Sequence, residues 1–344
     1  MEQNRYRALD IMKFVCALIV IIVHTSPLRP YSHLGNFILI NVFGRFAVPF
    51  FFICAGYFVH VNTLKYGSFY FKKYIWALIR LYLIWSIVYL PFGIDWVRSN
   101  MDIPMYLMPA ALLVGLFYSG TYFHLWYIPA LLFSLIVVHW FSRRYHSYKA
   151  LLICGFLLLC LGAMETYYGV ISNEFIIKVF DQYIKIFFTT RNGLFYGLFY
   201  VACGYYLVGS ERLKRIGHYG LLTILFFGLM VAEAFLLYNT NSLDFNFLIM
   251  AAPFTVYLFL FLKDLPCNLK LPYHKLQEYS TLYYFTHAMF LVLIPAFLQL
   301  FHQEWLFDDG MFRFISVMIC THLLSAALYR YGIYKKNKKR SASY

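Results

Sequence analysis

Three polar residues near the beginning of the chain, Asp10, Lys13 and His24, could do chemistry, although the stretch that holds them is otherwise mostly apolar. At about 100° per residue, a helix brings Lys13 and His24 to within about 20° of the same face. The helical rise separates them by about 16 Å, roughly half of a hydrocarbon core. An imidazole can take a proton from a hydroxyl group near neutral pH. The spacing therefore predicts a membrane helix with Lys13 towards the cytoplasm and a candidate general base, His24, towards the outside.

Asp10 strengthens this interpretation, because it lies three residues before Lys13. Residues with this spacing share a helix face, and pairing lowers the cost of burying either charge. Ionisable groups inside a bilayer are costly and usually mark a functional site. Two structural alternatives stay open: Lys13 can belong to an interfacial ion pair at a helix end, and His24 can be a satisfied structural residue.

Two further ionisable residues, Arg45 and His287, lie inside apolar runs. Pro49 follows Arg45, and a broken helix at this point can expose backbone groups to a cavity. The alternative for Arg45 is that its side chain extends to the outer interface. His287 lies seven residues into its apolar run, so we expect it to face the bundle interior. Glu233 is another intramembrane acid, without a recognisable motif.

His124 and Trp126 open a predicted span at the outer boundary, where tryptophan is also expected as part of the aromatic belt. The sequence has no Gly-rich phosphate loop, no closely spaced set of metal ligands and no Gly-x-Ser-x-Gly motif. These motifs are typical of nucleotide-driven pumps, metalloproteases and hydrolases. The pattern therefore favours a site with no metal.

The elements that position these residues must be membrane helices. Of the 344 residues 62% are hydrophobic and only 13% are charged, far from the composition of a soluble domain. Most of the seven cysteines lie in apolar runs, where thiols behave as small buried hydrophobes, so we expect no disulfide framework. The net charge of +14 lies in short loops beside the spans, as the positive-inside rule predicts, and does not indicate nucleic-acid binding.

We predict an all-α, polytopic membrane bundle of about ten transmembrane helices, because runs of ~20 apolar residues fill the chain. A segment at residues 105–118 is too short to cross and is expected to be a re-entrant or interfacial helix. An external amphipathic helix is expected within residues 169–191. The first span holds Lys13 and His24, and the others are predicted at about 36–61, 72–92, 123–141, 149–168, 192–209, 219–238, 246–262, 280–301 and 313–333.

Charge sets the orientation of this bundle. If residues 105–118 crossed the membrane, the basic loop at residues 143–149 would lie outside, against the positive-inside rule. We therefore expect a multi-pass protein of the plasma membrane with both termini cytoplasmic and no cleaved signal peptide. Residues 1–334 form the predicted transmembrane domain, and residues 335–344 form a basic cytoplasmic tail. The tail is interpreted as a topology anchor, with a nuclear-type or lipid-binding patch as alternatives.

At these residues the chain resembles the membrane acyltransferase-3 family over nearly its whole length. The spacing from Lys13 to His24 resembles the family's first motif, and Asp10 precedes it. Two departures are visible. Lys13 replaces the more usual arginine and loses the bidentate fork that suits phosphate, and Tyr74 and Ala77 occupy the spacing of an expected Arg-x-x-Arg. The later resembling segments are residues 45–52 with 56–58, residues 124–129, and Ser280 with Tyr284 and His287.

The resemblance implies transfer of an acyl group, commonly acetyl, from cytoplasmic acyl-CoA to an extracytoplasmic hydroxyl acceptor, often a carbohydrate. It implies that His24 is the base or acyl-transfer residue and that Lys13 contacts the donor or polarises its thioester. The substrate-binding residues would then be Asp10, Arg45, Arg80, His124, Trp126, Tyr284 and His287, with Arg80 on the donor side.

Residues 24–28 also resemble the membrane half of the vancomycin-resistance serine racemases, in the same superfamily. Those proteins are associated with L-serine supply and carry a cytoplasmic racemase domain after the last span. This chain ends at Tyr344, which we interpret as a stand-alone relative or a truncated membrane portion. The alternative function is therefore a membrane carrier for a small amino acid such as L-serine, with Arg45 binding its carboxylate.

Overall fold

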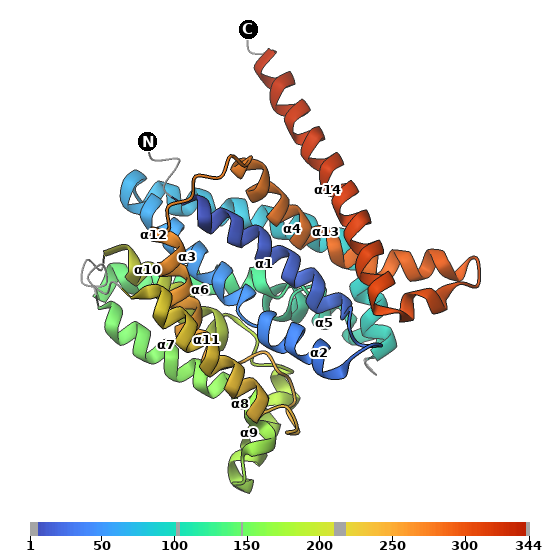
Figure 1. Ribbon diagram of the computed structural model, residues 1–344, viewed down its shortest axis with the longest axis horizontal. Helices are drawn as coiled ribbons and strands as arrows, with labels where there is room; N and C mark the ends of the chain where they lie inside the picture. Colours follow the sequence, from blue (N-terminus) through green and yellow to red (C-terminus); the bar gives the residue numbers. More distant parts are fainter. Residues whose placement is uncertain (1–5, 101–103, 146, 210–217, 342–344) are drawn as a thin grey trace. The chain divides into compact units, whose positions relative to one another are not determined.

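The computed structural model describes residues 6–100, 104–145, 147–209 and 218–341. Over these residues the chain is built from helices joined by short connections, with no β-strand (Figure 1). The predicted all-α, multi-pass bundle is thereby confirmed. The basic cluster Arg212, Lys214 and Arg215, which the positive-inside rule assigns to the cytoplasmic side, lies outside the described residues. The helices are α1 (Arg7–Thr25), α2 (His33–Ile38), η2 (Leu39–Phe43), α3 (Ala47–Tyr66), α4 (Ser68–Asn100), η3 (Met105–Leu107), α5 (Met108–Val114), η4 (Gly115–Ser119), α6 (Tyr127–Tyr145), α7 (Tyr148–Gly162), α8 (Met164–Tyr167), η5 (Tyr168–Val170), α9 (Glu174–Phe187), η6 (Gly193–Gly197), α10 (Leu198–Gly209), α11 (Tyr219–Leu236), α12 (Ala251–Asp264), α13 (Tyr273–Gln299), η8 (Glu304–Asp308) and α14 (Gly310–Ser341).

Seven helical stretches within the described residues are long and apolar enough to cross a membrane. The other three predicted spans correspond to α6, to the shorter apolar helix at Gly193–Val208, and to the 14-residue α12. The long stretches are Arg7–Thr25, His33–Tyr66, Ser68–Asn100, Tyr148–Val170, Tyr219–Leu236, Tyr273–Gln299 and Gly310–Ile333.

The short segments also take helical form. Residues 105–119 form η3, α5 and η4 in succession. In the predicted amphipathic segment, the helical spacing of α9 places Phe175, Val179 and Ile186 along one side and the charged Glu174, Lys178 and Lys185 along another, which confirms an amphipathic helix. The re-entrant or interfacial placement of residues 105–118 and the cytoplasmic position of the basic tail after residue 334 stay predictions, although α14 continues unbroken to Ser341.

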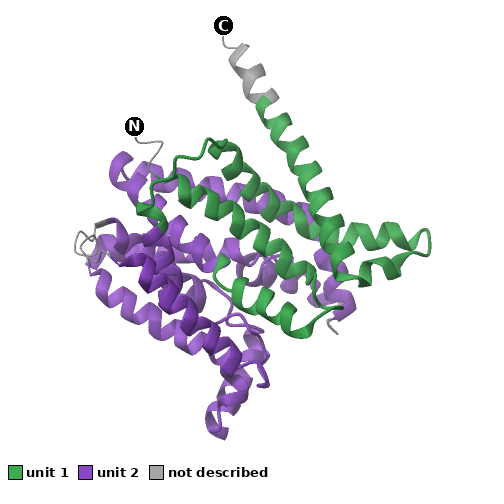
Figure 2. Ribbon diagram, in the orientation of Figure 1, with its two compact units in different colours: residues 1–47, 262–344 green, residues 48–261 purple. Residues whose placement is uncertain are grey.

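The chain divides into two compact units, coloured green and purple in Figure 2. Unit 1 joins the two ends of the chain, residues 1–47 and 262–344, and unit 2 comprises residues 48–261. In unit 1, α1 packs against α13 and α14. Residues far apart in the sequence therefore meet around α1.

Glycines allow very close packing between α3 and α10 in unit 2. A Cβ atom on Gly56 would lie 2.5 Å from the carbonyl oxygen of Val201, and one on Gly204 would lie 2.4 Å from that of Ile53. Small residues at such crossings let helix backbones approach, which supplies the van der Waals contact that drives association in a bilayer.

The first prediction concerns this contact. Gly56→Ala should destabilise the purified protein by about 1–3 kcal/mol, since the new methyl group forces α3 away from α10. The matched control is Gly228→Ala on α11, where a Cβ atom meets nothing within 4 Å and alanine favours the helix. Thermal unfolding in detergent would measure both. Equal midpoints for the two variants would contradict the close contact.

Candidate active site

The end of α1 places His24. The Thr25 hydroxyl donates to the carbonyl oxygen of Ile21 at 2.9 Å, which is a frequent side-chain contact in membrane helices. Ser26 then adopts a left-handed conformation with φ 49°, and its N–H donates to the Ile22 carbonyl. The helix therefore stops one residue after His24 and leaves the histidine in its last turn.

The ion pair predicted from sequence spacing is present at the other end of α1. Lys13 Nζ lies 2.7 Å from Asp10 Oδ1, and the two side chains are only 20% and 12% exposed. A carboxylate beside an ammonium group on the same helix lowers the cost of burying either charge. The contact confirms the predicted pairing, while the role of Lys13 towards a donor stays a prediction.

The structure brings His24 and His287 together, within unit 1. Their rings stack with centroids 5.3 Å apart and an interplanar angle of 24°. His287 is fully buried, and its Nδ1 lies 2.9 Å from the carbonyl oxygen of Tyr283. Because a carbonyl oxygen only accepts, Nδ1 carries the proton of a neutral His287 and Nε2 carries the lone pair. His287 thus presents a fixed tautomer beside His24.

A polar layer between α13 and α14 supports His287. The Tyr283 hydroxyl lies 2.7 Å from His322 Nδ1, and the hydroxyl groups of Thr286 and Ser325 lie 3.3 Å apart. Sequence reasoning selected Tyr284, which is half-buried and contacts the ring of Phe285 edge-on. It missed Tyr283, although a residue four positions before His287 must share its helix face.

Backbone contacts hold the segment after His24. A Cβ atom on Gly310 would lie 2.5 Å from the Ser26 carbonyl oxygen, so the start of α14 touches this loop directly. Tyr31 donates a short hydrogen bond to the Asp309 carboxylate, and Asp309 caps α14 by accepting from the Phe312 N–H at 2.8 Å. The connection after α1 is therefore fixed to the beginning of α14.

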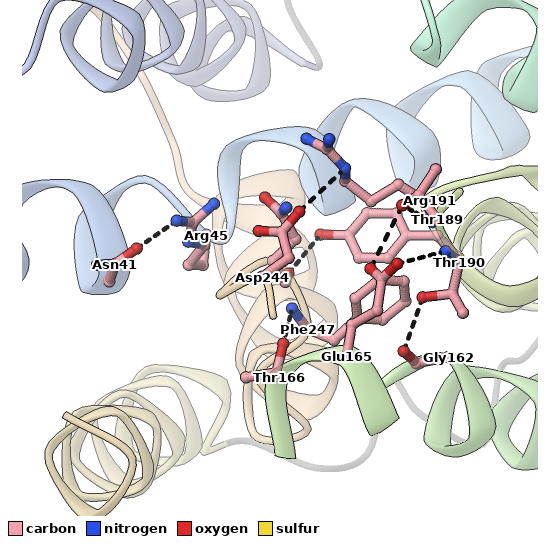
Figure 3. Close-up of polar contacts among 12 residues, drawn as sticks. Asn41, Arg45, Gly162, Glu165, Thr166, Thr189, Thr190, Arg191, Asp244 and Phe247 are labelled. Carbon is pink, nitrogen blue, oxygen red and sulfur yellow. Dashed lines mark hydrogen bonds and ion pairs between the residues drawn. The ribbon is translucent and has the colours of Figure 1, made fainter. Parts of the chain in front are cut away.

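Arg45 lies in the turn between η2 and α3, where the predicted break in the second span is found. Its guanidinium donates to the Asn41 side-chain oxygen (Figure 3). Pro49 lies in the first turn of α3, where its missing N–H costs nothing. A Cβ atom on the neighbouring Gly44 would lie 2.5 Å from Val23 Cγ2, so the backbone beside Arg45 packs against the residue before His24.

The remaining predicted residues belong to unit 2. His124 is 2% exposed. Its ring meets the Tyr89 ring edge-on, with the two ring centroids 4.6 Å apart. The Trp126 ring lies under the Arg191 guanidinium, with 5.7 Å from Cζ to the ring centroid. The centroids of the Trp126 and Tyr196 rings are 5.8 Å apart. Arg80 is exposed on α4. The structure thus gathers Asp10 with Lys13 and His24 with His287 in unit 1, and places His124, Trp126 and Arg80 in the other unit.

Glu233, which sequence reasoning left without a role, holds the start of α12. Its carboxylate accepts the N–H groups of Ile249 and Met250 at 2.5 and 2.8 Å and a hydrogen bond from Tyr167. A carboxylate at this position also complements the positive end of the helix dipole. Its burial is therefore accounted for by structure.

Comparisons with known proteins were made on the whole chain. A family model described as an acyltransferase domain matches residues 6–330. An amino-acid racemase of Enterococcus faecalis is 29% identical over 234 residues, which cover 65% of this chain and 32% of that protein. A second amino-acid racemase of that organism is 24% identical over 337 residues, or 95% and 46% of the two chains. A serine/alanine racemase of Enterococcus gallinarum is 25% identical over 238 residues, or 67% and 33%. The chain thus spans less than half the length of these relatives. No solved structure matches it.

The second prediction concerns pH. The Tyr31 hydroxyl and the Phe312 N–H lower the pKa of Asp309, so the contribution of this carboxylate is present above its ordinary pKa of about 3.9 and is lost as the pH falls through the lowered value. Exchange protection of the Phe312 amide, corrected for intrinsic rates, should therefore collapse only in acid. Tyr31→Phe should move the collapse to higher pH, whereas the exposed control Tyr106→Phe should not. Identical midpoints in both variants would contradict the contact.

Proposed function

Because this chain belongs to the membrane acyltransferase-3 family, we propose that it moves an acyl group, such as acetyl, from cytoplasmic acyl-CoA to an extracytoplasmic hydroxyl acceptor such as a cell-envelope sugar. The family and the apolar helices support the general activity, that of a multi-pass membrane acyltransferase. The observation that carries the specific proposal is the stacking of His24 on the buried His287.

The chemistry needs a base that accepts one proton. His24 takes the proton of the acceptor hydroxyl as its oxygen attacks the thioester carbonyl. The carbon–sulfur bond breaks, the thiolate of CoA leaves and takes up a proton, and the products are an ester and free CoA. The His287 ring stacks on His24 and is itself held through Nδ1 by the Tyr283 carbonyl oxygen, so it orients the base. His287 therefore serves as a positioning residue.

Lys13 is proposed to act on the donor. It lies about 16 Å along the helix from His24, on the side that the positive-inside rule assigns to the cytoplasm. Its ammonium group, 2.7 Å from Asp10 Oδ1, can act as a point charge towards a phosphate of the donor. Both chain termini are then cytoplasmic, and the partners are the lipid bilayer, acyl-CoA and a carbohydrate or other hydroxyl acceptor.

The names of the relatives favour a second candidate function. Two are called amino-acid racemases and one a serine/alanine racemase, and a membrane portion of such a protein could carry a small amino acid such as L-serine. Arg45, half-buried at the helix break, would then bind the substrate carboxylate. Uptake of L-serine that survives Arg45→Ala would count against this site.

The third prediction tests the base. Donor turnover by His24→Asn protein in vesicles, followed with radiolabelled acetyl-CoA, should fall by about 10²–10⁴-fold, the usual contribution of a positioned base. The control is His302→Asn, an exposed histidine of the same unit with φ 54°, a conformation that asparagine tolerates. Turnover retained by the His24 variant would rule out this mechanism.

The fourth prediction tests the placement of His24. Gly310→Ala should lower turnover at least tenfold with His24 intact, because the added methyl group displaces the Ser26 carbonyl that follows the histidine. Gly332→Ala, on the same helix but with nothing within 4 Å of its Cβ position, should leave turnover unchanged. The account fails if both variants show wild-type rates while thermal unfolding reports an equally folded protein.

A further inference from the structure

One ion pair in unit 2 is not used by the proposed mechanism. Arg191 Nε lies 3.3 Å from Asp244 Oδ2, and the two side chains are 35% and 28% exposed (Figure 3). Arg191 follows α9 and Asp244 precedes α12, so two separate loops supply the pair. Solvent can reach both partners, and so can a ligand.

A buried acid holds both partners in place. Glu165, 3% exposed, accepts the Thr190 N–H at 2.8 Å and the Thr189 hydroxyl at 3.3 Å. The same Thr189 oxygen accepts the N–H of Arg191 at 3.0 Å. The Glu165 backbone oxygen also accepts the N–H of Asp244 at 3.4 Å. Glu165 thus contacts the loops on both sides of the pair, and Figure 3 shows its side-chain contacts with Thr189 and Thr190.

Stability alone accounts poorly for this arrangement. A partly exposed ion pair such as Arg191–Asp244 contributes little to the free energy of folding. Burying a carboxylate such as that of Glu165 costs free energy even when it is well hydrogen-bonded. Fixing two polar groups by a second layer of hydrogen bonds is instead typical of binding sites, where each side chain must be held before the ligand arrives.

The hydrogen-bonding capacity of the pair is only partly used. In the part of the chain that the structure describes, the two terminal nitrogens of Arg191 make no hydrogen bond, and neither does Asp244 Oδ1. Arg191 Cζ lies over the Trp126 ring, 5.7 Å from the ring centroid. The site therefore offers N–H donors beside a carboxylate acceptor, against an aromatic ring.

The chemistry of the pair selects its ligand class. Neighbouring hydroxyl groups of a sugar ring can accept from the guanidinium and donate to the carboxylate at the same time. A free phosphate would be opposed by Asp244 and by the nearby Glu165, and a simple cation would be opposed by Arg191. Trp126 and its neighbour Tyr196 supply the apolar surface that small-molecule sites usually combine with a few polar groups.

We propose that Arg191 and Asp244, beside Trp126, form a carbohydrate-binding site within unit 2 that binds two adjacent hydroxyl groups of a sugar ring. The inference rests on the proposed function only for its ligand class, a carbohydrate, and concerns binding by unit 2 alone. It adds three residues that sequence reasoning did not select for this purpose: Arg191, Asp244 and the positioning residue Glu165.

The test measures binding apart from catalysis. The full chain in lipid nanodiscs is examined by saturation-transfer NMR with a panel of methyl hexopyranosides, their 2-deoxy and 3-deoxy analogues, and L-serine. The wild type should give saturable signals from at least one glycoside, and a deoxy analogue of that glycoside should lose most of them. Arg191→Gln and the isosteric Asp244→Asn should each reduce the signals at least fivefold. Asp181→Asn, which alters another acid of unit 2 that accepts a hydrogen bond from Tyr168, should leave them unchanged.

Three outcomes would overturn the subsite: no glycoside binds the wild type, binding is equal in all variants, or only L-serine binds in a manner that depends on Arg191 and Asp244. Because Asp244→Asn preserves shape, it keeps the test valid if Arg191→Gln fails to fold. His24→Asn separates the two proposals. Retained acyl transfer by that variant contradicts the proposed mechanism, whereas glycoside binding in the same variant tests the subsite alone.

Discussion

A titratable side chain inside a bilayer must find its hydrogen-bonding partners within the protein, because lipid offers none. Among the described residues, Lys13, His287 and Glu233 find such partners either within their own helix or on a separate element. Lys13 has Asp10 one turn away on α1, and His287 donates to the backbone of its own helix. Glu233 receives the N–H groups that precede α12. The buried Glu233 therefore also positions a second element, α12.

The same constraint explains why the candidate catalytic residues lie where helices end or break. A histidine in the middle of a lipid-facing helix would have no partner, whereas the last turn of α1 lets His24 stack on His287. Close backbone contacts then hold this end of α1 in place, with Gly310 against the Ser26 carbonyl and Gly44 against Val23. Arg45 follows the same pattern, since it lies in the turn before α3 and bonds to Asn41.

Contacts that depend on spacing within one helix could be predicted from the sequence, whereas contacts between distant parts of the chain could not. The helical fold follows from composition, and the Asp10–Lys13 pair follows from a three-residue spacing within one helix. The stacking of His24 on His287 was not predictable, because it joins helices from opposite ends of the chain. Arg191, Asp244 and Glu165 were missed for a related reason: they meet through loops that carry no periodic pattern. Tyr283 was not selected, although it lies four positions before His287 and therefore on the same helix face. Two of the predicted spans, at Gly193–Val208 and α12, coincide with helices of fewer than 18 residues, because runs of apolar residues do not reveal where a helix stops.

The central claim is that an acyl group supplied on one side of the membrane reaches a hydroxyl on the other through His24. It is tested most directly in sealed vesicles of known orientation, with radiolabelled acetyl-CoA confined to the cytoplasmic side and glycoside acceptors on the other. The account predicts labelled ester on the acceptor side with wild-type protein and none with His24→Asn. Equal labelling by the two proteins, or L-serine transport with no labelled ester at all, would contradict it.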